Sequence, residues 1–499
     1  MSLGTQILIR NALQHLQKNE LDSASILLQK AQESNSNNPD ILRLLSVVSA
    51  LRFDYIGALE LIDQVIALVP NHAIAFSNKG NILKEMGRHE EALIALDMAI
   101  ELDPTYSEAF LNKGNVLQDL YQFQESLIYY DKAITLNPSY AEAYSNKGNA
   151  LALLRYPNEA MYCYDQATAL NPDFIDAYWH KAIIQLPYGD YINGWQNYES
   201  RWFKSDPIHF QYSTISRLEN AQNIRGKRIL IWAEQGLGDS LQFCRYIELL
   251  HRLGGIVTFL VPSALLSVLS QLQQFCTLKT HHDNHAEFDL HSPLLSLPLV
   301  FATEVESVPA EIPYITANPE KIKLFEGRIL SSPNMKVGVI WNGGFRVGNP
   351  KLWAVNKRRN IELEQIAKLK EVAGVDFYSL QKGDPAESEF RVRQDEVWPK
   401  MTNCVQWLDD FSDTAALMQC LDLIISVDTS SAHLAGALGR PVWILNRYDS
   451  CWRWLHGRSD SPWYPSAKIY QQSEPGNWGS VLDQVKVDLS ALALKHLNQ

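Results

Sequence analysis

Apolar and polar positions in residues 1–187 repeat with a period of about 34 residues, within which apolar residues recur at helical spacing. A proline closes every second helix, because its ring cannot continue one. The recurring prolines are Pro70, Pro104, Pro138 and Pro172, and the recurring small residues are Ala58, Ala92, Ser126 and Ala160. This pattern predicts helix hairpins that bury their apolar faces only by stacking on one another.

The period of helix hairpins is typical of tetratricopeptide (TPR) repeats. The first helix of each unit carries an aromatic residue and, four positions later, a small residue that allows close helix packing. These pairs are Phe76 and Gly80, Phe110 and Gly114, Tyr144 and Gly148, and Tyr178 and Ala182. We expect residues 1–187 to form an all-α TPR superhelix of about five repeats and a partial sixth.

Asparagines recur at one position of the first helix in three repeats, Asn78, Asn112 and Asn146. An amide side chain both donates and accepts hydrogen bonds, so a row of them can hold the backbone of an extended acceptor polypeptide. Such ladders are a feature of the TPR superhelix of the O-GlcNAc transferases, which this region resembles. The alternative is that the asparagines belong to a common repeat consensus on a solvated face.

Residues 188–224 depart from the repeat pattern and concentrate aromatic side chains, Trp195, Tyr198, Trp202 and Phe203 among them. A flexible linker would be rich in Gly, Ser or Pro instead. The composition of this junction therefore predicts a packed joint.

From residue 225 onward, short apolar segments alternate with helical ones, which is the pattern of βαβ units. The expected strands are residues 228–233, 256–261, 276–280 and 288–291 in one lobe, and 336–341, 375–380, 404–407, 422–427 and 441–445 in a second. Two parallel sheets imply two Rossmann-like lobes with a cleft between them. We place these lobes at residues 225–330 and 331–499, so that the expected fold is multidomain, all-α and then α/β.

Charge and cysteine content narrow the possible partners. The chain has 44 basic and 56 acidic residues and a net charge of −12, which disfavours a surface that follows nucleic acid. Its six cysteines form no CxxC pair and no Cys/His metal-ligand spacing. No signal-peptide block and no apolar run of about 18 residues occurs, so we expect a cytoplasmic protein without a membrane span.

The loop after the first expected strand reads EQGLGDS and places Asp239 at the carboxyl edge of the sheet, where ligands of such folds bind. GLGD is not the GxGxxG fingerprint of a dinucleotide site. Asp239 is either a catalytic carboxylate or a first-turn residue that stabilises the helix dipole.

The segment DLIISVDTSSAHLAGALGRPVWIL predicts a buried strand, a polar turn and a helix. The free N–H groups at the start of such a helix are suited to bind a diphosphate. The candidate binding residues here are Asp428, Thr429, Ser430, Ser431 and His433. His433 is either a packed core residue or a donor to a phosphate oxygen.

Two further loops follow expected strands of the second lobe. WNGG offers backbone N–H groups for an anion nest and precedes a run of cations at residues 357–359, and QKGD follows the next strand. Each loop alone is compatible with an ordinary turn. The candidate anion-binding residues of these loops are Gly343, Gly344, Arg359, Gln381 and Lys382.

The segments GWQNYESRW, AEQGLGDSLQFCRY, YSLQKGD, DTSSAHLAGALGRPVW and CWRWLHGRSDSPWYP resemble the bacterial TPR-fused glycosyltransferases, whose catalytic domain is similar to ADP-heptose heptosyltransferases. The resemblance implies a GT-B fold with an acceptor-side first lobe and a nucleotide-sugar-side second lobe. It implies that Asp239 is the general base and that Asp428, Thr429, Ser430 and His433 bind the donor diphosphate. Arg359 aligns with a diphosphate-binding lysine.

The resemblance implies inverting, metal-independent transfer of a sugar from a nucleotide sugar to a protein hydroxyl, without a cofactor. Bacterial relatives of this architecture include flagellin modifiers, so flagellin or another surface protein is the expected acceptor. Two alternatives stay open: a heptosyltransferase-like enzyme acting on a glycan or lipid saccharide, and a non-catalytic TPR scaffold. Trp454, Trp463 and Tyr464 either stack on the donor or pack in the core.

Overall fold

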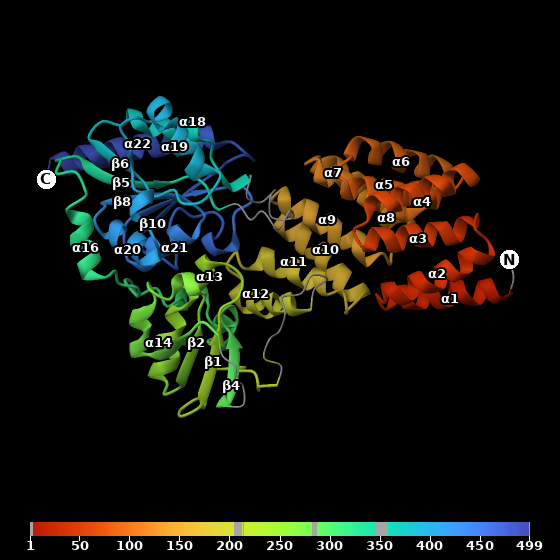
Figure 1. Ribbon diagram of the computed structural model, residues 1–499, viewed down its shortest axis with the longest axis horizontal. Helices are drawn as coiled ribbons and strands as arrows, with labels where there is room; N and C mark the ends of the chain where they lie inside the picture. The colour runs from red at the N-terminus through yellow and green to blue at the C-terminus, as the bar shows by residue number, and fades with distance from the viewer. Residues whose placement is uncertain (1–2, 204–211, 213, 282–286, 345–357, 499) are drawn as a thin grey trace. The chain divides into compact units, whose positions relative to one another are not determined.

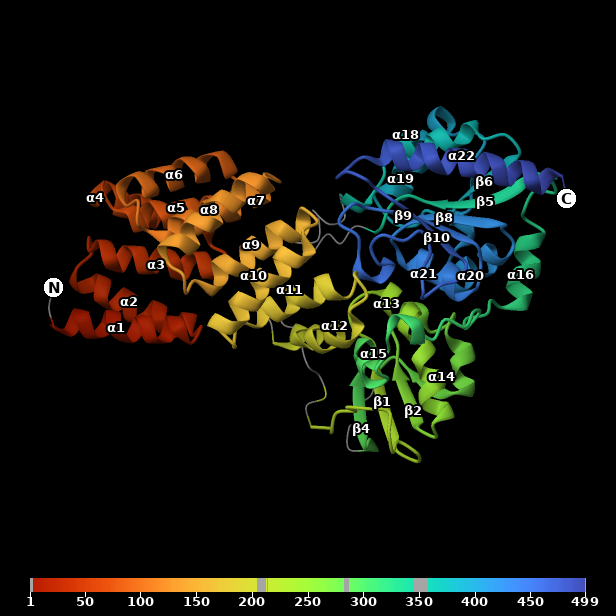
Figure 2. The ribbon, with the colours of Figure 1, turned by 180° about the vertical axis from the view of Figure 1, so that it is seen from behind.

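The structure, a computed structural model, describes residues 3–203, 212, 214–281, 287–344 and 358–498 (Figures 1 and 2). It divides into two compact units, Met1–Lys181 and Ala182–Gln499. We call the first the repeat unit and the second the α/β unit. Among the described residues, no helix has both the length and the apolar character that crossing a membrane requires.

The repeat unit consists of helices arranged as consecutive hairpins (Figure 1). Its helices are α1 (Leu3–Gln17), α2 (Leu21–Ser34), α3 (Pro39–Leu51), α4 (Tyr55–Leu68), α5 (Ala73–Glu85), α6 (His89–Leu102), α7 (Ser107–Asp119), α8 (Phe123–Leu136), α9 (Ala141–Leu153), α10 (Pro157–Leu170) and the first part of α11 (Ile175–Gln185). This all-α stack confirms the TPR architecture expected from the period.

The small residues of the repeats act as expected. A Cβ atom built on Gly114 of α7 would lie 2.5 Å from Cε1 of Tyr130 on α8, so only glycine lets the two helices approach this closely. The equivalent close contacts are Gly80 with Leu96 and Gly148 with Tyr164.

The turn within each hairpin repeats as well. One residue there has a positive φ, and the positions recur through the chain at the repeat period. They are Asn19, Phe53, Gly87, Tyr121, Arg155 and Gly189, the last between α11 and α12 (Tyr191–Tyr198). The turn between α11 and α12 therefore has a positive φ, as the turns of the repeats do.

The α/β unit contains two sheets whose paired strands are all parallel. The first has the order β3-β2-β1-β4 and the second the order β10-β9-β8-β5-β6-β7. The strands are β1 (Arg228–Trp232), β2 (Ile256–Leu260), β3 (Cys276–Lys279), β4 (Leu290–Pro293), β5 (Met335–Ile340), β6 (Val375–Ser379), β7 (Thr402–Asn403), β8 (Leu423–Val427), β9 (Val442–Asn446) and β10 (Ala467–Gln471). This arrangement is consistent with the expected GT-B-like fold.

Helices cover both faces of the second sheet. In Figures 1 and 2, α18, α19 and α22 lie on one face and α20 and α21 on the other. The helices of the unit, after α12, are α13 (Leu237–Phe243), α14 (Arg245–Arg252), α15 (Leu297–Val300), α16 (Pro319–Glu326), α18 (Leu363–Ile366), α19 (Ala386–Val397), α20 (Phe411–Gln419), α21 (Ser430–Ala437) and α22 (Trp478–Leu497). The two lobes meet where α13 packs on α21.

Two strand assignments made from the sequence require correction. Residues 404–407 are not a strand: Val405–Trp407 forms a 3₁₀ helix, and the neighbouring strand β7 has only two residues. The short apolar run CVQW resembled a strand, but such runs do not distinguish strand from helix. Strand β10, at the edge of the second sheet, was not among the expected strands.

The described part of the aromatic junction packs within the α/β unit. Trp195 is buried, donates to the Thr303 carbonyl oxygen at 3.0 Å, and contacts Trp452 with ring centroids 5.3 Å apart. Tyr198 also packs on Trp452, at 5.6 Å. These side chains hold α12 against both lobes.

Candidate functional site

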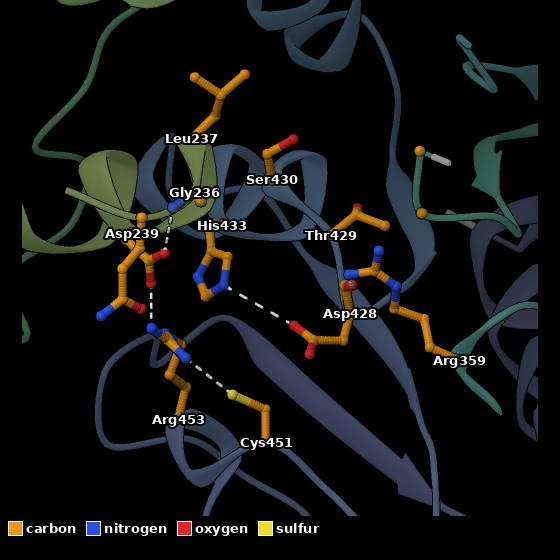
Figure 3. A pocket seen from close by; sticks show the side chains of 14 residues that line it. Gly236, Leu237, Asp239, Arg359, Asp428, Thr429, Ser430, His433, Cys451 and Arg453 are labelled. Carbon is orange, nitrogen blue, oxygen red and sulfur yellow. Dashed lines mark hydrogen bonds and ion pairs between the residues drawn. The ribbon is translucent and has the colours of Figure 1, made fainter. Parts of the chain in front are cut away.

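A cavity of about 480 Å³ lies between α13 of the first lobe and the loops after β5, β8 and β9 of the second (Figure 3). Its lining includes many of the residues expected from the sequence to carry the chemistry. Those residues are Asp239, Gly343, Gly344, Arg359, Asp428, Thr429, Ser430 and His433. The other lining residues are Gln235, Gly236, Leu237, Gly238, Cys451 and Arg453.

Asp239 reaches the cavity from the first turn of α13. Its Oδ2 accepts a hydrogen bond from the Gly236 backbone N–H at 2.8 Å, so the carboxylate also caps the helix start. Its Oδ1 accepts from the Arg453 guanidinium, with which it forms an ion pair (Figure 3). The carboxylate therefore has both the structural role and the position at the cavity that the sequence left as alternatives.

The turn after β8 starts α21 at the cavity. The hydroxyl of the N-cap residue Thr429 accepts from the Ala432 backbone N–H at 3.4 Å. The first N–H groups of a helix have no partner within it and carry the positive end of the helix dipole. The start of α21 at Ser430 is therefore a site suited to an anion.

His433 faces Asp428 from the second turn of α21, with its Nε2 4.0 Å from Oδ1 (Figure 3). Its Nδ1 lies 2.9 Å from the Tyr464 hydroxyl, and its ring stacks on Trp454. A Cβ on Gly238 would lie only 2.8 Å from His433 Cδ2, so glycine at that position allows α13 to pack on α21. His433 is thus packed in the interior and also lines the cavity.

Burial keeps His433 uncharged, and it disfavours the charged form of Asp428. Burial lowers the pKa of His433 to about 4 against the opposing effect of Asp428, so the imidazole is neutral near pH 7. Burial alone would raise the pKa of Asp428, but His433 and the cation Arg359 bring it below its usual range. Asp428 is therefore ionised near neutral pH.

Arg359 brings a cation to the side of the cavity opposite Asp239 (Figure 3). Its Nη1 donates to the Asp428 carbonyl oxygen at 3.2 Å. A Cβ on Gly343 would lie 2.4 Å from the Arg359 Cζ, so glycine makes room for the guanidinium. Lys357 of the same basic run lies outside the described residues.

Three expected anion-binding residues do not line the cavity. Gln381 is buried, and its Oε1 accepts from the backbone N–H groups of Trp341 at 3.0 Å and Asn342 at 2.8 Å. It thereby holds the loop that carries Gly343. The Lys382 ammonium donates to the Leu408 carbonyl oxygen. Ser431, in the first turn of α21, is half-buried and outside the lining.

Arg453 is a charged residue of the cavity that sequence reasoning missed. It lies within the segment CWRW, is 9 % exposed, and also donates to Cys451 Sγ at 2.9 Å. Burial by itself would lower the pKa of Arg453, but the charge of Asp239 keeps it well above its usual value. An arginine between two tryptophans was the available signal, because a buried cation needs an anionic partner.

A buried ion pair supports the loop that precedes Asp239. Arg201, from the junction, donates to Glu234 through Nε at 3.0 Å and Nη2 at 2.8 Å, and both side chains are fully buried. Next to it, Gln235 Nε2 donates to the Tyr198 hydroxyl at 3.1 Å. The aromatic junction therefore positions the loop that carries Asp239.

The asparagine ladder lies in the repeat unit, and part of it is hydrogen-bonded within the stack. The Asn112 amide donates to the Ser77 hydroxyl at 3.1 Å, and the Asn146 amide donates to Asn115 Oδ1 at 2.9 Å. The Asn78 Nδ2 is buried and, among the described residues, has no hydrogen-bond partner.

Known protein families match both units. Tetratricopeptide repeat models match residues 73–106, 107–140 and 141–174. The model of glycosyltransferase family 9 (heptosyltransferase) matches residues 399–475, which include Asp428, His433 and Arg453. The chain therefore contains segments similar to TPR repeats and a segment similar to glycosyltransferase family 9. This segment indicates a glycosyltransferase, as the resemblance implied.

Individual relatives are more distant. Protein FlbA of Caulobacter vibrioides is 26% identical over 337 residues, which cover 63% of this chain and 54% of FlbA. The chain thus spans about half the length of that relative. A thermophilic TPR protein of Thermus thermophilus is 21% identical with a TM-score of 0.35, covering 36% of this chain and 99% of its own. YrrB, a TPR protein with an unusual peptide-binding site, is 24% identical with a TM-score of 0.27, covering 34% and 88%.

Proposed function

We propose that the chain transfers a sugar from a nucleotide-diphosphate donor to a hydroxyl group of a protein that the repeats recruit. The observation that carries this proposal is the shared cavity, in which Asp239 of one lobe faces the start of α21 and Arg359 of the other (Figure 3). A base and an anion site on opposite walls are what a displacement at a sugar carbon requires. The family 9 segment supplies the start of α21.

The proposed reaction is a single displacement. The Asp239 carboxylate removes the proton from the acceptor hydroxyl, whose oxygen attacks C1 of the sugar. The bond from C1 to the diphosphate oxygen breaks as the new bond forms on the opposite face, so the configuration at C1 inverts. The proton remains on Asp239, and the electron pair leaves with the diphosphate.

Fixed positive groups stabilise the leaving diphosphate in this mechanism. The Arg359 guanidinium and the backbone N–H groups at Ser430 approach the same part of the cavity. Positive groups fixed where charge develops stabilise a transition state without reorganisation. The mechanism therefore requires no metal ion for charge neutralisation.

The repeats supply the acceptor in this proposal. Stacked TPR hairpins present an extended surface that can bind a polypeptide, and the side chains of Asn78, Asn112 and Asn146 lie at equivalent positions on it. The hydrogen bonds that two of these amides form within the stack hold them in a fixed orientation.

Intact-mass analysis tests the proposal, with cells that carry the parent gene, its deletion, or Asp239→Asn. We expect the same protein to lose one sugar mass in the deletion and in Asp239→Asn, because loss of a general base slows transfer roughly 10²–10⁴-fold. The control is Asp460→Asn, which removes a carboxylate from an exposed pair with Arg458 outside the cavity. Full modification in the Asp239→Asn cells would refute the base assignment.

A second candidate is a heptosyltransferase-like enzyme that glycosylates a saccharide. The description of the matched family favours it, and so do the hydrogen bonds that engage two ladder amides within the stack. The same cells distinguish the two candidates. A mass lost from a glycan or lipid saccharide, with all proteins unchanged, would establish the second and refute the first.

A further inference from the structure

Arg453 occupies an unusual position for a cation, because its guanidinium lines the donor cavity while it pairs with the proposed base. Nη2 donates to Asp239, Nη1 donates to Cys451 Sγ, and among the described residues Nε has no hydrogen-bond partner. Leaving a buried N–H of a charged group unpaired is costly. A ligand in the cavity could satisfy it.

The charges of the described cavity lining leave no excess for a diphosphate. Two arginines, Arg359 and Arg453, stand against two aspartates, Asp239 and Asp428, and His433 is neutral near pH 7. A diphosphate carries more than one negative charge, so its binding favours any cation that can be redirected toward it. Arg453 is already paired with the carboxylate of Asp239.

The backbone around Arg453 is fixed, whereas its long side chain has several rotatable bonds. Trp452 packs on Trp195, and Trp454 stacks on His433 with ring centroids 4.9 Å apart. A change of partner therefore needs only rotation of the side chain within the cavity. The planar guanidinium suits both partners, because its geometry matches the oxygens of a carboxylate and those of a phosphate.

We propose that Arg453 is a second diphosphate-binding residue, which alternates between the Asp239 carboxylate and the phosphate oxygens of the donor. This inference rests on the proposed function. When Arg453 binds the diphosphate, Asp239 loses its cation and becomes a better proton acceptor. Donor binding then precedes activation of the base, and the acceptor hydroxyl reacts only in the ternary complex.

Calorimetric titration of the full chain with ADP, GDP and UDP tests the exchange. We expect Arg453→Gln to weaken the nucleoside diphosphate that the parent binds by about tenfold or more, since a charge-assisted hydrogen bond is lost. We expect Asp239→Asn to tighten it severalfold, because Arg453 no longer has to leave a carboxylate. In the double variant this tightening should disappear.

Asp428→Asn is the matched control, because it also removes a carboxylate of the cavity. Its effect on nucleotide affinity should be similar with Arg453 and with Gln at that position, whereas the effect of Asp239→Asn should depend on Arg453. Arg453→Lys replaces Arg453→Gln in the test if the latter fails to fold. It should also weaken nucleotide binding, because an ammonium group lacks the bidentate geometry of a guanidinium.

The outcomes separate this inference from the proposed function. If the parent binds none of the three nucleoside diphosphates, the proposed donor class is wrong and the exchange falls with it. If the parent binds one and Asp239→Asn leaves its affinity unchanged or weakens it, the exchange is refuted while the proposed function stands. Equal tightening by Asp239→Asn with and without Arg453 would also refute it.

Discussion

The repeat unit and the α/β unit use ion pairs in opposite ways. In the repeat unit one pair recurs, joining a lysine on each of α5, α7, α9 and α11 to an aspartate 16 residues before it on the preceding helix. The pairs are Lys79–Asp63, Lys113–Asp97, Lys147–Asp131 and Lys181–Asp165. In the α/β unit, by contrast, the ion pair between Asp239 and Arg453 joins residues 214 positions apart and does not recur along the sequence.

The ion pairs of the two units also differ in how deeply they are buried. The aspartates of the recurring pairs are about half exposed, whereas both side chains of the Arg201–Glu234 pair are fully buried. Solvent replaces an exposed partner at little cost, but a buried charge that loses its partner stays uncompensated. The repeat unit should therefore tolerate the loss of any one recurring pair, whereas the α/β unit should not tolerate the loss of a buried pair such as Arg201–Glu234.

The largest expected effect follows from the buried pair. Glu234→Gln should destabilise the α/β unit by about 1.5–3 kcal/mol, because the buried Arg201 loses the Glu234 carboxylate and keeps only that of Glu199. Asp97→Asn in the repeat unit should cost less than about 1 kcal/mol. Urea unfolding of the full chain measures both. Tryptophan fluorescence reports on the α/β unit, which holds all but Trp179 of the 13 tryptophans, and circular dichroism at 222 nm reports mainly on helices.

The double variant Arg201→Met with Glu234→Gln is the control for this comparison. It removes both charges, so it should recover part of the stability that Glu234→Gln loses. Equal losses of stability in Glu234→Gln and Asp97→Asn would contradict the contrast between the two units.

Low pH should destabilise the α/β unit more than the repeat unit. Burial lowers the pKa of His433 and of His291 to about 4, whereas burial raises the pKa of Asp119 and of Glu142. A histidine with a depressed pKa contributes stability that is complete above its unfolded value near 6.5 and is lost as the pH falls toward 4. A carboxyl with a raised pKa is penalised when charged, so lower pH relieves the repeat unit.

The urea midpoint of the α/β unit, detected by fluorescence, should therefore decrease when the pH is lowered from 7 to 4.5. This decrease should be larger than that of the urea midpoint of the repeat unit. His433→Gln should flatten this decline, since a shift of this size corresponds to at most about 3 kcal/mol. An unchanged slope in His433→Gln would show that His433 is not held neutral.

The two units also differ in how much of their structure could be predicted from the sequence. The repeat period gave the helix hairpins and the close contacts of Gly80, Gly114 and Gly148, because each contact recurs locally. It did not reveal the turn positions with positive φ, because only Gly87 and Gly189 of the six are glycines. Residues such as Phe53 and Tyr121 adopt that conformation because the packed helices on either side impose it.

In the α/β unit the sequence could place residues at the carboxyl ends of parallel strands, and this brought Asp239, Asp428 and Thr429 to one cavity. It could not predict Arg453 there, because that residue follows β9 by several positions and reaches Asp239 only through the packing of two lobes. Gln381 was placed at the correct sheet edge, but its amide binds the neighbouring loop.

The smallest expected effect tests whether the repeats are as tolerant in packing as in charge. Gly114→Ala should destabilise the repeat unit by about 1–2 kcal/mol, because the new methyl meets the rigid Tyr130 ring and overpacking outweighs the better helix propensity of alanine. Gly479→Ala, in the first turn of α22, measures that propensity alone, since a Cβ there lies 3.5 Å from its nearest neighbour. It should stabilise the α/β unit by up to about 1 kcal/mol. A Gly114→Ala chain as stable as the parent by circular dichroism would mean that the hairpin can spread, and that the repeat unit tolerates packing changes as well as the loss of a charge.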